Sequence, residues 1–331
     1  MRENPYLVRM DVEDDCNFTT YNEKSGIYYR QFNWPVTGVM KDEFDCMQFD
    51  NAEAKPVGYH EHSFGTETFM VSQGKFLCYC MGSGFYLEPG DLLHIQPWMG
   101  HSFTPIEPNS RLNIMFMGIN QFKGITEVRR RLTADFPGVF EDPEFQKVFV
   151  LKNGNAGHRT FPAENIVEPE KVSQLRKDGV GIREHDYGCI KLLLKIAKYE
   201  TMGEKEVWDL YMKPGFYCDW DNFVQEYRLF WVMSGKVHCT VKTSATETLE
   251  FDAVADNTIV IPPFTPFRFE VVEEAHVRDL DCTARLQDLC EELDAWKAEN
   301  PDAKMDKEEM FGKFREFEFN ATDIGCKCCD K

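Results

Sequence analysis

Four residues in the first third of the chain have the types and spacing of a metal-binding site. His60 and His62 are two positions apart, so both imidazoles point to one face if the segment is extended. Glu67 follows after a short turn and begins an alternating apolar run that ends at Gly74. His101 comes after a second strand-like run and a Pro-Trp-Met-Gly turn. Imidazole and carboxylate suit divalent Fe, Mn, Ni, Zn or Cu, so the pattern predicts one transition-metal ion per chain.

The punctuation around these residues resembles a known family. The stretch from His60 to Gly74 is similar to the first conserved motif of the cupin superfamily, and the stretch from Gly90 to His101 is similar to the second. The resemblance covers residues 58–103 directly. It implies an antiparallel β-barrel, a double-stranded β-helix, with the metal inside. By the same resemblance the metal ligands are His60, His62, Glu67 and His101.

The second half of the chain repeats the first without its metal ligands. Phe230–Lys236 aligns with Phe69–Lys75, and Ile261–Phe269 aligns with Ile95–Phe103. A shared long period indicates two copies of one unit. The ligand positions of the copy are occupied by Asp221, Phe223, Arg228 and Phe267. We therefore interpret residues 219–269 as a degenerate copy and the whole chain as a bicupin with one intact metal-binding barrel.

The degenerate copy is expected to be structural. Phe267 should fill the space that a metal would occupy, and Arg228 should pair with Asp221 or Glu226, because a lone buried guanidinium is costly. The less favoured alternative is an anion bound at Arg228.

Strand and helix signals predict a mainly β chain with a partly helical connector and a C-terminal helix, and the cupin resemblance implies that the strands form two cupin-type barrels. The predicted segments are an N-terminal arm (1–27), the metal-binding barrel (28–119), the connector (120–187), the degenerate barrel (188–283), and a C-terminal helix with a cysteine-containing tail (284–331). Leu286, Leu289, Cys290, Leu293 and Trp296 recur at helical spacing. This apolar stripe should dock on a barrel or on a second subunit, and a homodimer is expected.

The tail contains Cys326, Cys328 and Cys329. Its spacing is not that of a zinc finger, so a frayed, reduced tail is expected, with soft-metal binding or oxidant sensing as alternatives.

Aromatic and titratable residues near the ligand positions are candidates for catalysis and substrate binding. Tyr59, Tyr86 and His94 could transfer protons, although His94 lies inside a strand, where a packed barrel histidine is the plainer interpretation. Phe69 and Trp98 could contact an apolar or planar part of a substrate.

Arg111 and Asn113 share one face of the strand that follows His101. If that face points inward, they could clamp a carboxylate or an enolate. The hydrophobic pattern favours the opposite arrangement, in which Leu112, Ile114 and Phe116 fill the barrel.

The ligand set predicts a metal more firmly than it predicts a reaction. The leading hypothesis is a metal-dependent oxidoreductase, a dioxygenase-like enzyme acting on a small oxygen-bearing organic molecule. The alternative is a non-redox isomerase or a lyase such as a decarboxylase, in which the metal polarises a carbonyl. A third possibility is a cupin that binds a metal or a small molecule without turnover. Oxygen consumption separates the first two classes.

Composition excludes several classes of partner. The 331 residues, 43% of them hydrophobic, are enough for two ordinary domains. A net charge of −19 argues against nucleic acid as a partner. No window reaches the roughly 20 apolar residues of a membrane helix, so no membrane partner is expected. The segment Met1–Pro5 lacks the apolar core of a signal peptide, and a cytoplasmic location is expected.

Overall fold

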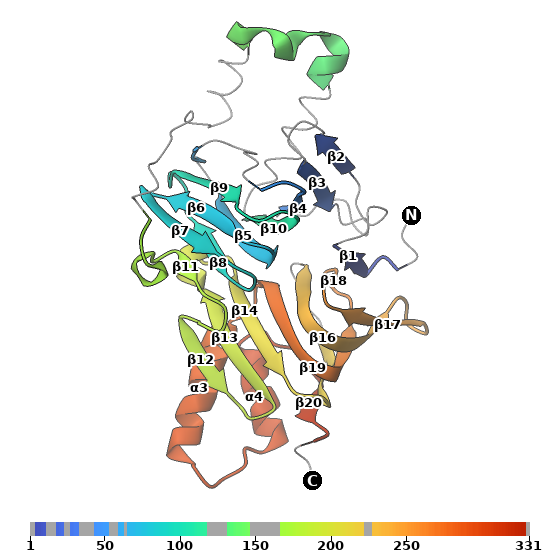
Figure 1. Ribbon diagram of the computed structural model, residues 1–331. Helices are drawn as coiled ribbons and strands as arrows, with labels where there is room; N and C mark the ends of the chain where they lie inside the picture. The colour runs from blue at the N-terminus through green and yellow to red at the C-terminus, as the bar shows by residue number, and fades with distance from the viewer. Residues whose placement is uncertain are drawn as a thin grey trace. The chain divides into compact units, whose positions relative to one another are not determined.

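The computed structural model describes residues 4–10, 18–22, 27–32, 43–52, 59–62, 65–117, 131–145, 166–221 and 227–328. The chain divides into two compact units. The first barrel unit comprises Cys16–Asn33 and Gly38–Asp178, and the second barrel unit comprises Met1–Asp15, Trp34–Thr37 and Gly179–Lys331. Antiparallel strands dominate both units (Figure 1), so the predicted mainly β, cupin-type fold is confirmed.

The first barrel unit is built from two sheets. A seven-stranded sheet has the order β11-β8-β5-β10-β4-β3-β2, and a three-stranded sheet has the order β7-β6-β9. The strands are β2 (Phe18–Asn22), β3 (Ile27–Phe32), β4 (Glu43–Phe49), β5 (Thr66–Gln73), β6 (Phe76–Cys80), β7 (Ser83–Leu87), β8 (Leu92–Ile95), β9 (His101–Pro105), β10 (Ser110–Met117) and β11 (Leu175–Arg176).

The second barrel unit contains one ten-stranded sheet, whose main path is β1-β18-β16-β19-β14-β13-β12. Its strands are β1 (Leu7–Arg9), β12 (Arg183–Asp186), β13 (Ile190–Ile196), β14 (Glu206–Met212), β15 (Phe216–Asp221), β16 (Arg228–Lys242), β17 (Thr248–Val254), β18 (Asn257–Ile261), β19 (Phe267–Cys282) and β20 (Asp323–Cys326). Two helices follow the barrel, α3 (Leu286–Glu299) and α4 (Lys307–Glu316).

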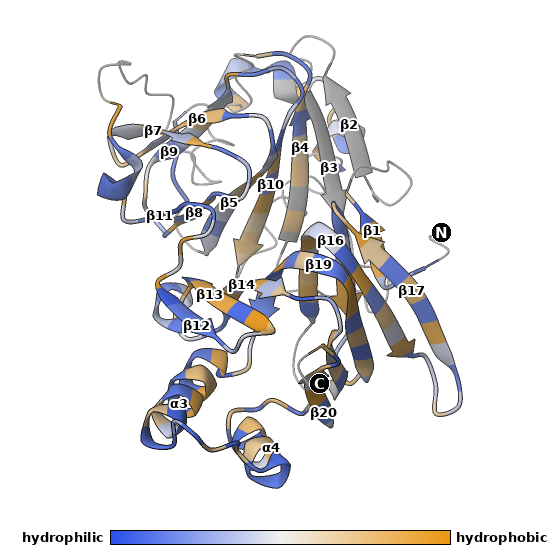
Figure 2. Ribbon diagram, turned by 60° about the horizontal axis from the view of Figure 1, so that its bottom comes forward, coloured by the Kyte–Doolittle hydropathy of each residue, from blue (hydrophilic) through white to orange (hydrophobic). Residues whose placement is uncertain are grey.

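Period-two alternation gives each barrel its own core. Along β6, Phe76, Cys78 and Cys80 are buried while the residues between them are partly exposed. Along β16, Val237, Cys239 and Val241 belong to the core of the second barrel unit. Bands of alternating hydropathy are visible along β16 and β17 (Figure 2). Each sheet therefore directs one row of apolar side chains inward.

The internal repeat reappears in the backbone at two glycines. Gly74 has φ +75° and Gly235 has φ +80°, so both lie in the left-handed region. An added Cβ would overlap Ser110 at the first position and the carbonyl oxygen of Glu274 at the second. Both glycines therefore allow a close approach of the neighbouring strand at matching places in the two copies.

The apolar stripe predicted near the C-terminus lies on α3. Leu286, Leu289 and Cys290 are buried in the core of the second barrel unit, and Leu293 packs against it. Both α3 and α4 carry one hydrophobic and one hydrophilic face (Figure 2). The stripe is thus covered by its own barrel, and it no longer argues for a second subunit. The homodimer stays a prediction.

The chain termini differ from the predicted arm and tail. The arm predicted over residues 1–27 contains two strands: β1 pairs with β18 in the second barrel unit, and β2 pairs with β3 in the first. The tail is not frayed at Cys326, because β20 pairs with β15 and buries that thiol. Cys328 is exposed, and Cys329 lies outside the described residues.

The connector predicted over residues 120–187 is described only in part. It contains a helical turn at residues 131–135, the 3-10 helices Val139–Glu141 and Pro169–Lys171, and the strands β11 and β12. Residues 118–130 and 146–165 lie outside the described part.

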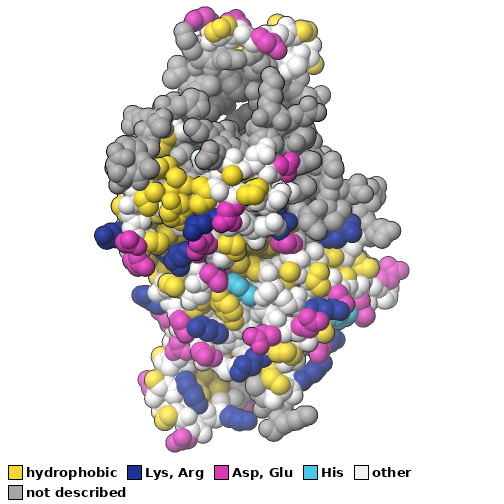
Figure 3. All heavy atoms as spheres, in the orientation of Figure 1, with side chains coloured by type: hydrophobic (Ala, Val, Ile, Leu, Met, Phe, Trp, Pro, Cys, Tyr) yellow, Lys and Arg dark blue, Asp and Glu magenta, His cyan; other side chains and the backbone are white. Residues whose placement is uncertain are grey.

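The described surface is charged but mixed in sign. Acidic and basic side chains are interspersed over the face in Figure 3, despite the net charge of −19. Within the described residues, no helix is both long and apolar enough to cross a membrane.

Candidate metal centre

The segment before β5 runs beside β9, and together they carry three of the predicted ligands. His60 and His101 form an antiparallel bridge, with N–H to carbonyl distances of 2.9 and 2.8 Å. The Trp98 amide donates to the carbonyl oxygen of His62 at 2.7 Å, which extends this pairing. Since His60 and His62 are two residues apart on an extended segment, their imidazoles share one side. Glu67 comes from the other sheet, at the start of β5.

The side chains of these four residues gather at one point inside the first barrel unit. One donor atom from each of His60, His62, Glu67 and His101 lies within 4.8 Å of the others. All four are buried. The ring centroid of His60 lies 4.8 Å from that of His62 and 4.3 Å from that of His101. The spacing in the sequence therefore predicts which side chains converge.

Hydrogen bonding selects the tautomer of His101. Its Nδ1 lies 2.8 Å from the carbonyl oxygen of Met99, which can only accept, so Nδ1 carries the proton. The Nε2 atom then turns its lone pair toward Glu67 Oε2, 2.8 Å away. The same carboxylate oxygen is 3.0 Å from Nε2 of His62. Lone pairs that face each other at this distance need a cation between them, either a proton or a metal.

The electrostatics of Glu67 favour an ionised carboxylate. Burial by itself would raise the pKa of Glu67, but positive charge and hydrogen bonds at His101 and His62 outweigh burial and hold the pKa well below the usual range, so the cation between these atoms keeps the carboxylate ionised. Three imidazoles and one ionised carboxylate form a donor set that fits a divalent first-row metal. The residues present therefore fit the ion that the cupin resemblance implies.

Aromatic rings enclose the ligand cluster. Phe69 lies 5.7 Å from the His101 ring, and Phe116 lies 6.0 Å from the His62 ring. Phe103 packs on Phe69 at 4.9 Å. The predicted position of Phe69 beside the site agrees with this packing. These rings exclude water, which strengthens every electrostatic interaction in the centre.

The sequence does not predict two polar residues that lie beside the ligand cluster. Thr66 and Gln96 line a small hollow together with His62, Glu67 and Phe116. Thr66 is buried, and its Oγ1 has no hydrogen-bond partner in the described part of the chain. Strict alternation would place Thr66 on the face opposite Glu67, so the sequence carries no signal for its position.

The predicted proton-transfer and aromatic candidates lie in other surroundings. His94 is 3.0 Å from Thr68 Oγ1, on the sheet face opposite the core residues of β8, as the packed-histidine interpretation expects. Tyr86 faces away from the core, with Lys75 Nζ 4.9 Å from its ring centroid. Trp98 is 63% exposed, and the Tyr59 ring packs against the backbone of Gly100. These positions lend no support to their predicted roles.

The sheet geometry has the arrangement that the hydrophobic pattern favours, and not the inward clamp of Arg111 and Asn113. Leu112 and Ile114 belong to the core of the first barrel unit, so the alternating residues face the other way. Arg111 Nε donates to Ser72 Oγ at 2.9 Å. The aliphatic side chains fill the barrel because burying them is favourable, whereas a buried guanidinium needs a partner.

The second barrel unit places Arg228 where the first places Glu67. Glu67 pairs with Ile95 in β8, and Arg228 pairs with Ile261 in β18, so the two registers match. Arg228 binds the carboxylate of Asp279, with Nε 2.8 and 2.9 Å from its two oxygens.

Asp279 is not one of the two predicted partners, and the pairing of Arg228 with Asp221 or Glu226 stays a prediction. The Asp221 side chain, Phe223 and Glu226 lie outside the described residues. Phe267 is buried between Phe230 and Phe269, as expected for a residue that fills the barrel.

Comparison with known proteins gives the fold and nothing finer. No family model matches the chain, and no curated protein sequence matches it. Among solved structures, a mutant of the Bacillus subtilis oxalate decarboxylase is similar at 15% identity with a TM-score of 0.51, covering 82% of this chain and 75% of that one. Lactobacillus farciminis oxalate decarboxylase in a formate complex is similar at 13% identity with a TM-score of 0.50, covering 84% and 86%. The chain therefore shares the overall cupin-type fold of these proteins.

Proposed function

We propose that the first barrel unit binds one divalent transition metal through His60, His62, Glu67 and His101, and that the chain is a metal-dependent enzyme. The observation that carries the proposal is the convergence of four buried donor residues, with one donor atom from each within 4.8 Å of the others, and the Nδ1 of His101 is hydrogen-bonded to the carbonyl oxygen of Met99. In metal sites, a histidine ligand is oriented by a hydrogen bond from the ring nitrogen that does not bind the metal, and the Met99 carbonyl oxygen accepts such a bond from His101.

Within this proposal, a lyase reaction on a small carboxylic or keto acid takes first place. The sequence slightly favours dioxygenase-like chemistry. The solved structures of this fold are named as oxalate decarboxylases, which supports the decarboxylase alternative for this chain. An isomerase, a dioxygenase and a binding protein without turnover remain the competing functions.

The residues around the cluster have defined parts in such a reaction. A bound metal would act as a Lewis acid toward a substrate oxygen. Phe69 and Phe116 would keep water from the reacting atoms.

Metal content tests the ligand set. The purified protein should contain one equivalent of a transition metal. His101→Ala should lose most of it, because the substitution removes a ligand and the hydrogen bond to Met99 that orients it. His94→Ala is the matched control, because this buried histidine of the same barrel faces Thr68. Equal metal loss in both variants, or full retention in His101→Ala, would show that the ligand set is wrong.

Product analysis tests the reaction class. The metal-loaded protein should be incubated with oxalate and a panel of small keto and hydroxy acids, while carbon dioxide and dissolved oxygen are recorded together. Carbon dioxide release without net oxygen uptake supports the lyase. Stoichiometric oxygen uptake would support the dioxygenase instead, and binding without turnover would support the third hypothesis.

A further inference from the structure

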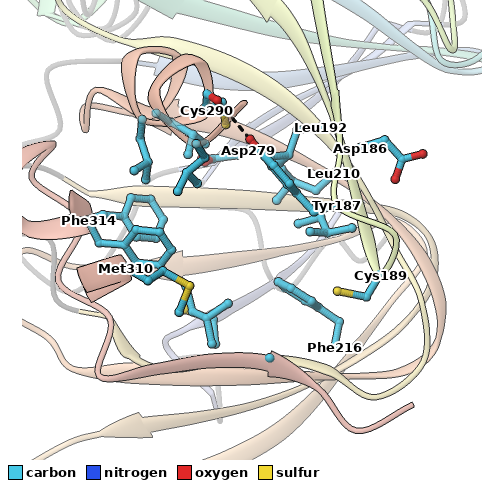
Figure 4. A pocket seen from close by; sticks show the side chains of 18 of the residues that line it. Asp186, Tyr187, Cys189, Leu192, Leu210, Phe216, Asp279, Cys290, Met310 and Phe314 are labelled. Atoms are coloured by element: carbon cyan, nitrogen blue, oxygen red, sulfur yellow. Dashed lines mark hydrogen bonds between the residues drawn. The ribbon is translucent and has the colours of Figure 1, made fainter. Parts of the chain in front are cut away.

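The second barrel unit contains a cavity of about 520 Å³. Strands form one wall, through side chains such as Leu192, Leu210 and Phe216. The helices form the other wall, with Met310 and Phe314 of α4 facing the strand residues across open space (Figure 4). The cavity therefore lies between the barrel and its two C-terminal helices.

The walls are almost entirely apolar. Among the residues that the structure describes, the lining consists of hydrocarbon, aromatic and sulfur-containing side chains and one glycine, except for Asp186, Tyr187, Arg228, Asp279 and Lys297. Each of these five polar residues already has a partner in the protein. Arg228 binds Asp279, Tyr187 donates to the carbonyl of Cys290 at 3.3 Å, Lys297 donates to the carbonyl of Pro301 at 2.7 Å, and Asp186 accepts from the Gly188 amide at 2.7 Å.

A space with these walls favours an organic occupant over water. Close-packed interiors contain few voids larger than a water molecule. Each water takes roughly 30 Å³ and needs two to four polar partners, which walls of Phe, Leu and Met side chains do not supply. The volume of about 520 Å³ falls within the range of small-molecule pockets, roughly 300–1,000 Å³.

The polar end of the cavity sets the charge of the occupant. Arg228 and Asp279 form a buried bidentate pair, so their charges cancel. Because the guanidinium and the carboxylate already neutralise each other, an added anion or cation would be buried without a countercharge. A neutral ligand avoids both costs of charge burial.

We propose that the second barrel unit binds a neutral, mainly hydrocarbon or aromatic small molecule between its strands and the helices α3 and α4. The site is separate from the ligand cluster of the first barrel unit and does not depend on a metal. The second copy of the fold therefore has a binding function of its own, at the register position where the first copy has Glu67.

Titration with the neutral fluorescent probe N-phenyl-1-naphthylamine tests the proposal on the full chain. The probe should bind one per chain with saturation in the micromolar range. Leu293→Trp, which fills the cavity from α3, should weaken the affinity by about tenfold or more. Ala295→Trp is the matched control, because Ala295 is exposed on the same helix, and its affinity should be unchanged. Circular dichroism checks that both variants keep the native fold.

Competition defines the chemical class. Decanol should displace the probe at lower concentration than decanoate or decylamine does. Absence of saturable binding, equal affinity in Leu293→Trp and the control, or stronger displacement by decanoate would each overturn the proposal. Probe binding should persist in His101→Ala, so failure of the metal proposal would leave this result untouched.

Discussion

Replacing Glu206 with Gln should stabilise the second barrel unit at alkaline pH. Glu206 is 2% exposed, and its Oε2 accepts hydrogen bonds from Trp208 Nε1 at 2.8 Å and from the backbone N–H of Gln287 at 3.1 Å. Burial outweighs these bonds and raises the pKa of Glu206 to about 7. Glu206 thus connects β14 to the start of α3, and its buried carboxyl group is kept neutral below this pKa.

The size of the effect follows from this pKa. The carboxyl group has an ordinary pKa of 4.5 and a folded-state pKa of about 7. At about 1.36 kcal/mol per pKa unit, the difference corresponds to about 3 kcal/mol. Because the folded-state pKa is raised, this stabilisation is complete below the unfolded pKa and is lost as pH rises through the folded value. A glutamine does not titrate, and its amide oxygen can accept both hydrogen bonds.

Urea unfolding of the two proteins near pH 4.5, 6, 7 and 8 measures the prediction. The free energy of unfolding of Glu206→Gln minus that of the parent should increase with pH by about 3 kcal/mol across this range. Other titrating groups cancel in the difference. Glu247→Gln, on an exposed loop residue, should give a difference that is flat in pH. A flat difference for Glu206→Gln as well would refute the reasoning.

Three further substitutions test the second barrel unit. Phe267→Ala should cost about 3–5 kcal/mol in thermal or urea unfolding while leaving the metal content unchanged, because it empties a buried aromatic position. Arg228→Met should cost about 3–5 kcal/mol because it leaves the Asp279 carboxylate buried, and adding Asp279→Leu should recover most of this loss. Gly235→Ala should lower the melting temperature measurably, since its φ of +80° and its approach to Glu274 both disfavour a side chain; an unchanged melting temperature would contradict the close approach.

The sequence was most informative where chemistry and local geometry coincide. His60 and His62 share a face because extended chains have a period of two, and turn residues bring His101 to pair with that segment. The internal repeat could also be predicted from the sequence. Glu67 pairs with Ile95 in the first copy, and Arg228 pairs with Ile261 at the equivalent positions of the second.

Contacts between residues far apart in the sequence could not be predicted. Asp279, the partner of Arg228, is 51 residues away, and only the register between β16 and β19 decides which carboxylate it meets. The pairing of β1 with β18 and of β20 with β15 likewise depends on which sheet edges are available. By contrast, the start of α4 has a signal in the local sequence. Asp306 is a favourable N-cap residue, and its side chain accepts a hydrogen bond from the Glu308 amide at 3.0 Å.

The division of strands in the first barrel unit has a mechanical consequence. In the second barrel unit, β16 and β19 run unbroken for 15 and 16 residues. The first barrel unit divides the corresponding lengths into β5 and β6 and into β9 and β10, which belong to separate sheets. Glu67 lies on the larger sheet and His101 on the smaller one, so an ion bound by both residues would connect the two sheets directly. In the second copy, backbone pairing between β16 and β19 runs from Phe230 and Asp279 to Val241 and Phe267, so the corresponding lengths are joined within one sheet.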